Sequence, residues 1–341
     1  MQQKHIRITI RTVAADAGVS VAAVSKVLRN AYGVSSELRA KVQASVAKLG
    51  YRPRLAARAM RGRSYTLGVL LPDIRNPFFS DILDGLNAAL IRTQYQPVLA
   101  VSPSVSIEQT LVDSMLDRQI DGMIVLGPRM SLPEAETVAT RVPTVFIAYH
   151  EPRATSFDTV NNDDQMGAAL VVNHLVATGR RRIAFLNLEL ADRGALVVTG
   201  QREIGYRSAM TEAGFAQHID VVRAELTSRE VQIAAKHLLQ KREPPEAIFC
   251  WTDFIAFEVI SVANELGLSI PEDLAIVGYD NTHYCDLAQN ALTSIDQSGQ
   301  VLGLQAARLL VERVEGRTKA EHFVVTPRLV VRRSSQMPER S

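Results

Sequence analysis

The sequence predicts an α/β protein of two parts: a three-helix head that contains a helix-turn-helix, and a body of two doubly wound α/β units. Apolar residues recur at helical spacing through the first fifty residues, and short β-branched runs alternate with helical segments from residue 64 onward. Charge divides the chain at the same place. Residues 1–63 hold thirteen basic and two acidic side chains, whereas the rest hold 25 basic and 34 acidic ones. A basic head on an acidic body indicates that affinity for nucleic acid resides in the head.

Length and composition set the outer limits. The 341 residues, 47% of them hydrophobic, suffice for two or three domains. No run approaches eighteen apolar residues and no secretory signal opens the chain, so we expect a cytoplasmic protein without a membrane segment. The two cysteines, Cys250 and Cys285, lack paired spacing, which argues against a thiolate metal site. We expect neither a metal nor a cofactor.

The stretch from Ile10 to Asn30 predicts two short helices joined by a turn at Gly18, with Ser20 as the cap of the second helix. The expected core residues are Val13, Ala14 and Ala17 on the first helix, Val19 in the turn, and Val24, Val27 and Leu28 on the second. This is the geometry of a helix-turn-helix, whose second helix enters a major groove. The alternative is a loop between two core helices.

The N-terminal half of the second helix offers Val21, Ala22 and Lys26 to a groove. Val21 and Ala22 are too short and apolar for bidentate hydrogen bonds, so they could contact a thymine methyl or exclude a bulky base. Lys26 can reach guanine or a phosphate.

A third helix follows, capped by Ser35 or Ser36, with Val42, Val46 and Leu49 on its core face and its end at Gly50. Pro53 then breaks the helical run. The segment Leu55–Arg61 contains strong helix formers but is too short to fold alone. Arg58 and Arg61 could bind phosphates while Met60 serves as an apolar wedge in a minor groove. A plain linker is the alternative.

The body alternates strand and helix, which predicts parallel sheets covered on both faces. In the first series the strands are expected at 65–71, 98–101, 122–126 and 143–147, and the helices at 78–93, 107–116 and 133–140. In the second series, which starts after 158–160, the strands are expected at 182–186, 221–224, 247–250 and 275–279, and the helices at 165–177, 202–213, 230–240 and 255–266. Two such units leave a cleft at the carboxyl ends of their strands, where small ligands bind.

These motifs resemble the LacI/GalR family of bacterial transcription repressors. The match runs from Val13 to Leu28, through Gly33-Val-Ser35, and through Leu49-Gly-Tyr-Arg-Pro53. It continues in the body with the segments Asp73–Ser80, Asp163-Asp-Gln-Met-Gly167, His174-Leu175, Val277-Gly-Tyr-Asp280 and Leu292–Gln297. The resemblance implies the fold of type I periplasmic binding proteins for the body, with a chain that crosses between two subdomains three times.

The resemblance also implies domain limits. Residues 1–54 would form the DNA-binding domain, 55–63 the hinge helix and linker, and 64–341 the effector-binding and dimerisation domain. Subdomain N would comprise about 64–161 and 292–326, and subdomain C about 162–291 and 327–341, with crossings near 161, 291 and 326. Such crossings form a hinge that can close over a ligand.

Site residues are carried over one by one. The expected DNA contacts are Thr9, Ser20, Val21, Ala22, Ser25, Lys26, Arg29, Arg54, Arg58 and Met60. The expected effector contacts are Asp73, Asn76, Phe78, Phe79, Arg202, Trp251, Asp253 and Tyr279. The family usually has leucine at the position of Met60 and arginine at the position of Lys26, and lysine lacks the planar fork of arginine.

The sequence therefore predicts a repressor whose affinity for a pseudo-palindromic double-stranded operator is controlled by a small molecule, most simply a sugar or sugar derivative. A purine or nucleoside is the alternative effector. Homodimers are expected through helices near Phe78–Thr93 and Ile107–Asp117. A sugar-binding or sugar-processing protein without DNA function is the alternative from another class, but no phosphate loop, Gly-x-Ser-x-Gly elbow or His-Glu-x-x-His motif supports an enzyme.

Overall fold

The computed structural model describes residues 8–28, 31–51, 62–102, 104–189 and 197–336. The chain divides into two compact units, Met1–Ser64 and Tyr65–Ser341. The predicted hinge segment Leu55–Arg61, including Arg58 and Met60, lies outside the described residues, as do two other expected DNA contacts, Arg29 and Arg54.

The head contains the three predicted helices, α1 (Ile10–Ala17), α2 (Val21–Leu28) and α3 (Ser36–Leu49). Local chemistry sets their ends. The side chain of Thr9 accepts a hydrogen bond from the Thr12 amide, and Gly18 ends α1 in the left-handed region at φ 62°. Ser20 Oγ accepts from the amide of residue 23, and Ser35 Oγ caps α3. The sequence prediction of Ser20 as a cap is therefore confirmed.

The core of the head is small and apolar. Its buried members are Val13, Ala14, Ala17, Val24, Val27 and Val42. One polar cluster ties α1 to α3, because Asp16 accepts from Ser45 Oγ at 2.7 Å and from Lys48 Nζ at 2.7 Å. These hydrogen bonds, led by that of Lys48, lower the pKa of Asp16.

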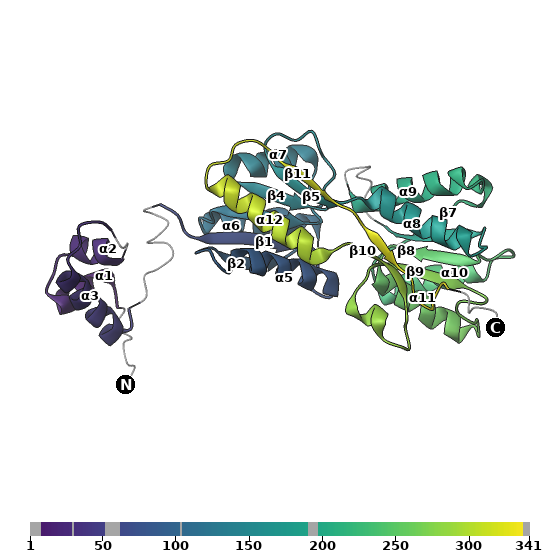
Figure 1. Cartoon of the computed structure of the whole chain (residues 1–341), viewed down its shortest axis with the longest axis horizontal. Coiled ribbons are helices and arrows are strands. Elements are labelled where there is room, and N and C mark those ends of the chain that lie inside the picture. The colour runs from purple at the N-terminus through teal and green to yellow at the C-terminus, as the bar shows by residue number, and fades with distance from the viewer. Residues whose placement is uncertain (1–7, 29–30, 52–61, 103, 190–196, 337–341) are drawn as a thin grey trace. The chain divides into compact units, whose positions relative to one another are not determined.

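The first subdomain of the body is a parallel sheet in the order β11-β5-β4-β3-β1-β2 (Figure 1). Its strands are β1 (Thr66–Leu71), β2 (Gln96–Val101), β3 (Gly122–Leu126), β4 (Thr144–Ile147), β5 (Asp158–Asn162) and β11 (His322–Val325). Its helices are α5 (Pro77–Leu90), α6 (Val105–Asp117), α7 (Leu132–Arg141) and α12 (Gly299–Val314).

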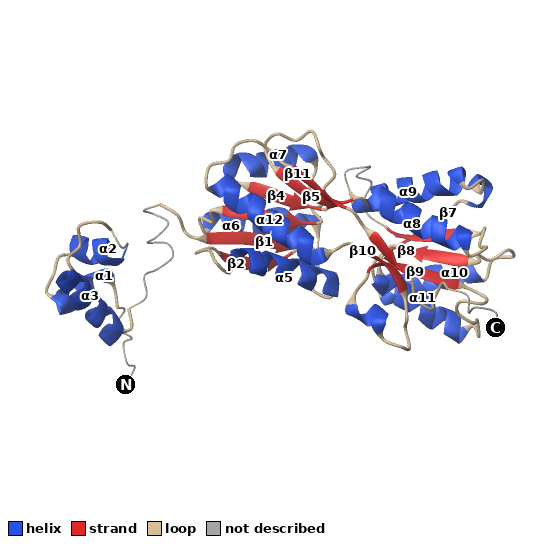
Figure 2. Cartoon of the chain, viewed as in Figure 1, coloured by secondary structure: helices blue, strands red, loops and turns tan. Residues whose placement is uncertain are grey.

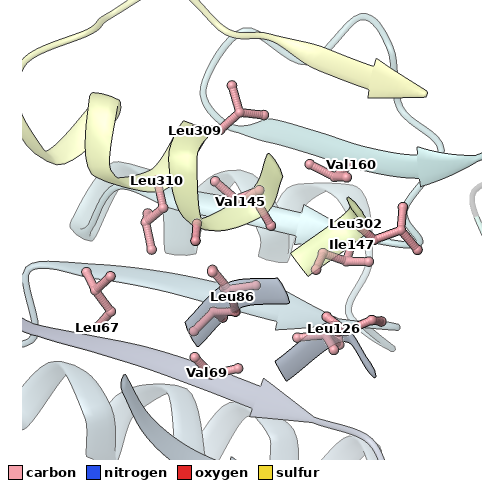
Figure 3. Packing of buried hydrophobic residues seen from close by; sticks show 14 of the residues in the cluster. Leu67, Val69, Leu86, Leu126, Val145, Ile147, Val160, Leu302, Leu309 and Leu310 are labelled. Carbon is pink, nitrogen blue, oxygen red and sulfur yellow. The ribbon is translucent and has the colours of Figure 1, made fainter. Parts of the chain in front are cut away.

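Helices cover both faces of this sheet, which is why its central strands are buried on both sides (Figure 2). On one face, α5 and α12 pack against the strands through side chains that Figure 3 shows interleaved, among them Leu67, Leu86, Val145, Leu302 and Leu310. A second core, which includes residues of α6 and α7, lies on the other face.

Glycines let α5 and α12 approach closely. A Cβ at Gly303 would lie 1.8 Å from the carbonyl oxygen of Ile82, and one at Gly85 would lie 1.9 Å from that of Gln300. Because α12 begins directly after the chain returns from the second subdomain, this contact fixes the return segment to the first subdomain.

The second subdomain has the sheet order β12-β10-β9-β8-β6-β7, in which only β12 is antiparallel to its neighbour. Its strands are β6 (Ile183–Leu188), β7 (Asp220–Ala224), β8 (Ala247–Cys250), β9 (Ala275–Asp280), β10 (Thr293–Asp296) and β12 (Arg328–Val330). Its helices are α8 (Asp164–Ala177), α9 (Val198–Glu212), α10 (Ser228–Leu239) and α11 (Asp253–Glu265), with short 3₁₀ turns at Ala216–His218 and His283–Asp286.

The chain passes between the sheets three times, between β5 and α8, between β10 and α12, and between β11 and β12. The second passage corrects the expectation of a crossing near residue 291. Thr293–Asp296 pairs with β9 and β12 and so belongs to the second sheet, and the crossing falls at residues 297–298. Within the described part of the chain, no helix combines the length and apolar character needed to cross a bilayer.

Candidate functional site

The exposed face of α2 carries both apolar and basic side chains. Val21, Ala22 and Lys26 are exposed there, and Ser20 is exposed at the N-terminal end of the helix. Thr9, before α1, is also exposed. These placements fit the sequence assignment of a groove-facing surface. Ser25 differs, because it is only 9% exposed.

The body contains a cavity of about 500 Å³ at the carboxyl ends of strands from both sheets. It is bounded by Asp73, Asn76, Phe78, Phe79, Arg129, Asn162, Asp164, Thr199, Arg202, Trp251, Asp280, Gln297 and further, mostly apolar residues. Six of the eight expected effector contacts line it: Asp73, Asn76, Phe78, Phe79, Arg202 and Trp251. Its volume is in the range of small-molecule sites.

Phe78 and Phe79 both line the cavity but differ in burial. Phe78 is 8% exposed and belongs to the hydrophobic core beneath α5, although its ring also reaches the cavity. Phe79 is only partly buried and lines the same wall. On the second subdomain, Trp251 follows β8 and gives the cavity another flat apolar face.

A buried ion pair between residues of the cavity lining joins α8 and α9 of the second subdomain. Arg202 Nε donates to Asp164 Oδ1 at 2.8 Å, and the side chains are 3% and 1% exposed. The guanidinium carbon lies 3.5 Å from the ring centre of Tyr279. Burial raises the pKa of Asp164, but the charge of Arg202 and a hydrogen bond with His150 outweigh it, so that pKa lies below its usual value.

Asn76 and Asp280 form a direct hydrogen bond between the two subdomains, as His150 and Asp164 also do. Asn76 Nδ2 donates to Asp280 Oδ2 at 2.8 Å, while Gln297 Nε2 in the crossing segment donates to Asp280 Oδ1 at 2.6 Å. Asn76 also caps α5 by accepting from the Phe78 amide, which fixes the orientation of its side-chain amide. Burial, together with the neighbouring Asp253, raises the pKa of Asp280 to about 8.

Asp253 and Tyr279 are not on the cavity wall, which corrects their sequence assignment as effector contacts. Asp253 is 1% exposed, and its carboxylate accepts hydrogen bonds from the Thr282 amide, the Thr282 and Ser294 hydroxyls and the Cys285 thiol. Its oxygens are therefore occupied within the second subdomain. Tyr279 is fully buried beneath Arg202.

Among the polar cavity residues that sequence reasoning missed are Asn162, Asp164, Asp280 and Gln297. Each lies at or next to the end of a strand, and three of them stand inside the matched segments. Their position at strand ends could have identified them, because the carboxyl ends of parallel strands meet at one edge of the sheet, where ligands bind. Among the described residues, the buried Oδ1 of Asn162 and Nε1 of Trp251 have no hydrogen-bond partner.

The head and the body of the chain each match a known protein family or domain. Residues 9–54 match the model of bacterial regulatory proteins of the lacI family, and residues 172–335 match that of a periplasmic binding protein-like domain. Catabolite control protein A of Priestia megaterium is 30% identical over 333 residues, which cover 97% of this chain and 99% of that protein.

Two solved structures have a similar fold. A complex of the transcriptional regulator CelR with cellobiose is 27% identical, with a TM-score of 0.71 over 96% of this chain and all of the other. The lac repressor dimer bound to operator and an anti-inducer is 24% identical, with a TM-score of 0.82 over 97% of this chain and 99% of the other. The chain therefore belongs to the lacI family of bacterial regulatory proteins and is a DNA-binding transcription regulator with an effector-binding body, not an enzyme.

Proposed function

We propose that this regulator is a cytoplasmic repressor that binds a pseudo-palindromic operator as a homodimer, and that a carbohydrate in the cavity sets its affinity for that operator. The exposed surface of α2 supports the DNA part. Val21 and Ala22 offer methyl groups to a groove, and Lys26 offers a cation one turn later.

The observation that carries the carbohydrate assignment is that residues lining one cavity combine flat apolar faces with buried polar atoms that have no partner among the described residues. The rings of Phe79 and Trp251 suit the C–H face of a sugar. Asn162 Oδ1 can accept from a hydroxyl group and Trp251 Nε1 can donate to one, and both atoms are buried without a protein partner among the described residues. The similarity to a cellobiose complex agrees with this class.

A purine or nucleoside is the second candidate. The same aromatic faces can stack on a base, and Asp280 and Gln297 can hydrogen-bond to its edge. A sugar has hydroxyl groups for more of the polar side chains around the cavity than a base has, and we therefore prefer a sugar as the effector.

The bond between Asn76 and Asp280 supports a coupling mechanism. A ligand that competes for either side chain changes the contact between the subdomains, and thereby the angle at the three crossing segments. Coupling in such systems is typically about 1–3 kcal/mol, or roughly a 5- to 150-fold change in affinity.

Exposed apolar residues on the first subdomain support a dimer. Ile91 is 81% exposed after α5, Leu99 is 49% exposed on the edge strand β2, and Ile107 is 41% exposed on α6. Burial of this set between two copies would remove it from water. We expect sedimentation of the full-length chain to show a dimer, and Leu99→Asp to shift it toward monomer.

Two experiments test the function. Selection of duplexes from a random-sequence library by the full-length chain should recover an inverted repeat, and Lys26→Ala should weaken binding to it by about tenfold or more. A thermal-shift screen of sugars, sugar acids and nucleosides should give a hit, since a ligand at 100 times its Kd stabilises the fold by about 2.7 kcal/mol. Recovery of DNA without a repeat, or a hit that leaves operator affinity unchanged, would contradict the proposal.

A further inference from the structure

Three arginine side chains line the cavity, and carboxylates of the cavity neutralise two of them. Arg202 pairs with Asp164 at 2.8 Å. Arg75 pairs with Asp73 at 2.9 Å, and its Nε also donates to that carboxylate. These four charges cancel within the protein.

The third arginine, Arg129, is placed differently. It follows β3 at the cavity wall, and its Nη1 donates to the carbonyl oxygen of Ser102 at 2.7 Å. The nearby carboxylate of Glu108 accepts the backbone amide of Arg129, at 3.1 Å to each oxygen, rather than its guanidinium. Within the described ranges, no carboxylate forms an ion pair with the Arg129 side chain. A neutral carbonyl thus orients a charged fork that is half-buried and keeps donors available.

The remaining acidic group of the cavity does not balance this charge. Asp280 receives hydrogen bonds from two neutral amides, those of Asn76 and Gln297. Its burial near Asp253 raises its pKa to about 8, so it is largely protonated at neutral pH. The cavity therefore has an excess of positive charge, located on the wall of the first subdomain at Arg129.

We infer that the effector bears an anionic group, the carboxylate of a sugar acid or the phosphate of a sugar phosphate, and that the Arg129 guanidinium binds it. This inference rests on the proposed carbohydrate effector and specifies its chemistry. The fork of an arginine matches two oxygens of a carboxylate or phosphate in parallel hydrogen bonds. The sugar ring then lies against Phe79 and Trp251, and its hydroxyl groups meet Asn162.

The test uses fluorescence of Trp251, the only tryptophan of the chain and part of the cavity wall. The full-length protein is titrated with matched neutral and anionic sugars: glucose against glucuronate and the corresponding hexose phosphate, galactose against galacturonate and its phosphate, and ribose against its phosphate. One anionic member should bind about tenfold or more tightly than its neutral partner, because hydrogen bonds to charged groups are stronger than neutral ones. The carboxylate and phosphate arms identify which anion is preferred.

Variants assign the preference to Arg129. Arg129→Gln should reduce the ratio of neutral to anionic Kd to about threefold or less, and Arg129→Lys should keep part of that ratio. Arg229→Gln, at an 86% exposed position on α10, is the matched control and should bind like the parent. If Arg129→Gln does not fold, the ratio measured with Arg129→Lys decides.

Different results would contradict the anionic group and the carbohydrate effector. A neutral sugar that binds as tightly as its anionic partner overturns the anionic class and leaves the carbohydrate effector in place. So does a ratio of neutral to anionic Kd that stays at the parent value in Arg129→Gln or, where that variant does not fold, in Arg129→Lys. Absence of binding by every member of every set contradicts the carbohydrate effector and this inference together.

Discussion

Replacement of Arg202 by methionine tests how much the buried ion pair between Arg202 and Asp164 contributes to stability. Methionine keeps much of the length and removes the charge and the donors. In the parent, Arg202 donates to Asp164 and to the carbonyl oxygen of Trp251, and it stacks on Tyr279. The variant leaves Asp164, at 1% exposure, hydrogen-bonded to His150 but without the charge of Arg202.

The expected cost follows from that geometry. Removal of one member of a buried ion pair typically costs about 3–5 kcal/mol, because the other charge stays buried without compensation. For a domain of this size, 1 kcal/mol shifts the melting temperature by about 2–4 °C, so we expect a fall on the order of 10 °C.

The pH dependence gives a second readout. In the parent, the pKa of Asp164 lies below its ordinary value, so the pair contributes stability above about pH 4 and loses it as pH falls further. In Arg202→Met only the contact with His150 opposes burial, so we expect the pKa of Asp164 to rise and the variant to lose stability as pH rises above about 4. The gap between the two melting temperatures should therefore be largest near neutral pH and shrink toward pH 4.

The assay is calorimetry of the full-length chain, with far-UV circular dichroism to confirm that the variant is folded. The double variant Arg202→Met/Asp164→Leu should recover most of the lost stability, because an apolar pair of similar volume can replace a buried ion pair at little cost. A melting temperature of the single variant within about 2 °C of the parent, or strictly additive single effects, would refute the reasoning.

Three other changes have outcomes that follow from single contacts. The folded pKa of Asp280 is about 8, so its carboxyl group takes up a proton on folding and lowers stability as pH rises from about 4 to 8. Asp280→Asn should therefore make the melting temperature less dependent on pH in that range. An unchanged slope of melting temperature against pH would contradict this. Asp253→Asn should lower the melting temperature but leave the affinity of a cavity ligand nearly unchanged, and equal losses in both would return this residue to the binding site. Gly303→Ala should separate α5 from α12 at a cost of about 1–3 kcal/mol or more, against little effect of Leu304→Ala at an exposed position of the same helix, and equal denaturation midpoints for the two would contradict the close approach.

The helices of the head were predictable because their signals are local. Thr9, Ser20 and Ser35 cap helices through hydrogen bonds to amides three residues away, and Gly18 adopts the positive φ that few other residues tolerate. The buried strands of the body were predictable for the same reason, since a strand covered on both faces reads as a continuous apolar run. The strand β10 was missed because its place depends on pairing with β9 and β12, not on its own composition.

The cavity was predictable in position but only partly in membership. Six expected contacts line it, because the ends of parallel strands and the starts of helices converge at one edge. Asp253 and Asp280 show the limit. Both follow apolar strands of the second sheet, and their sequence context does not separate them, yet one is enclosed by hydroxyl and thiol donors and the other reaches the cavity.

The sequence by itself determined the fold class, the family and the division of charge between head and body, because periodicity, caps and motifs are properties of neighbouring residues. Only the tertiary structure decided which charged groups are neutralised. Arg202 meets Asp164 across 38 residues of sequence, and Asn76 meets Asp280 across 204. Ion pairing and desolvation depend on distances of a few ångströms between such segments, and packing sets those distances. The charge of Arg129, which no carboxylate among the described residues pairs with, specifies the proposed effector and follows from that packing.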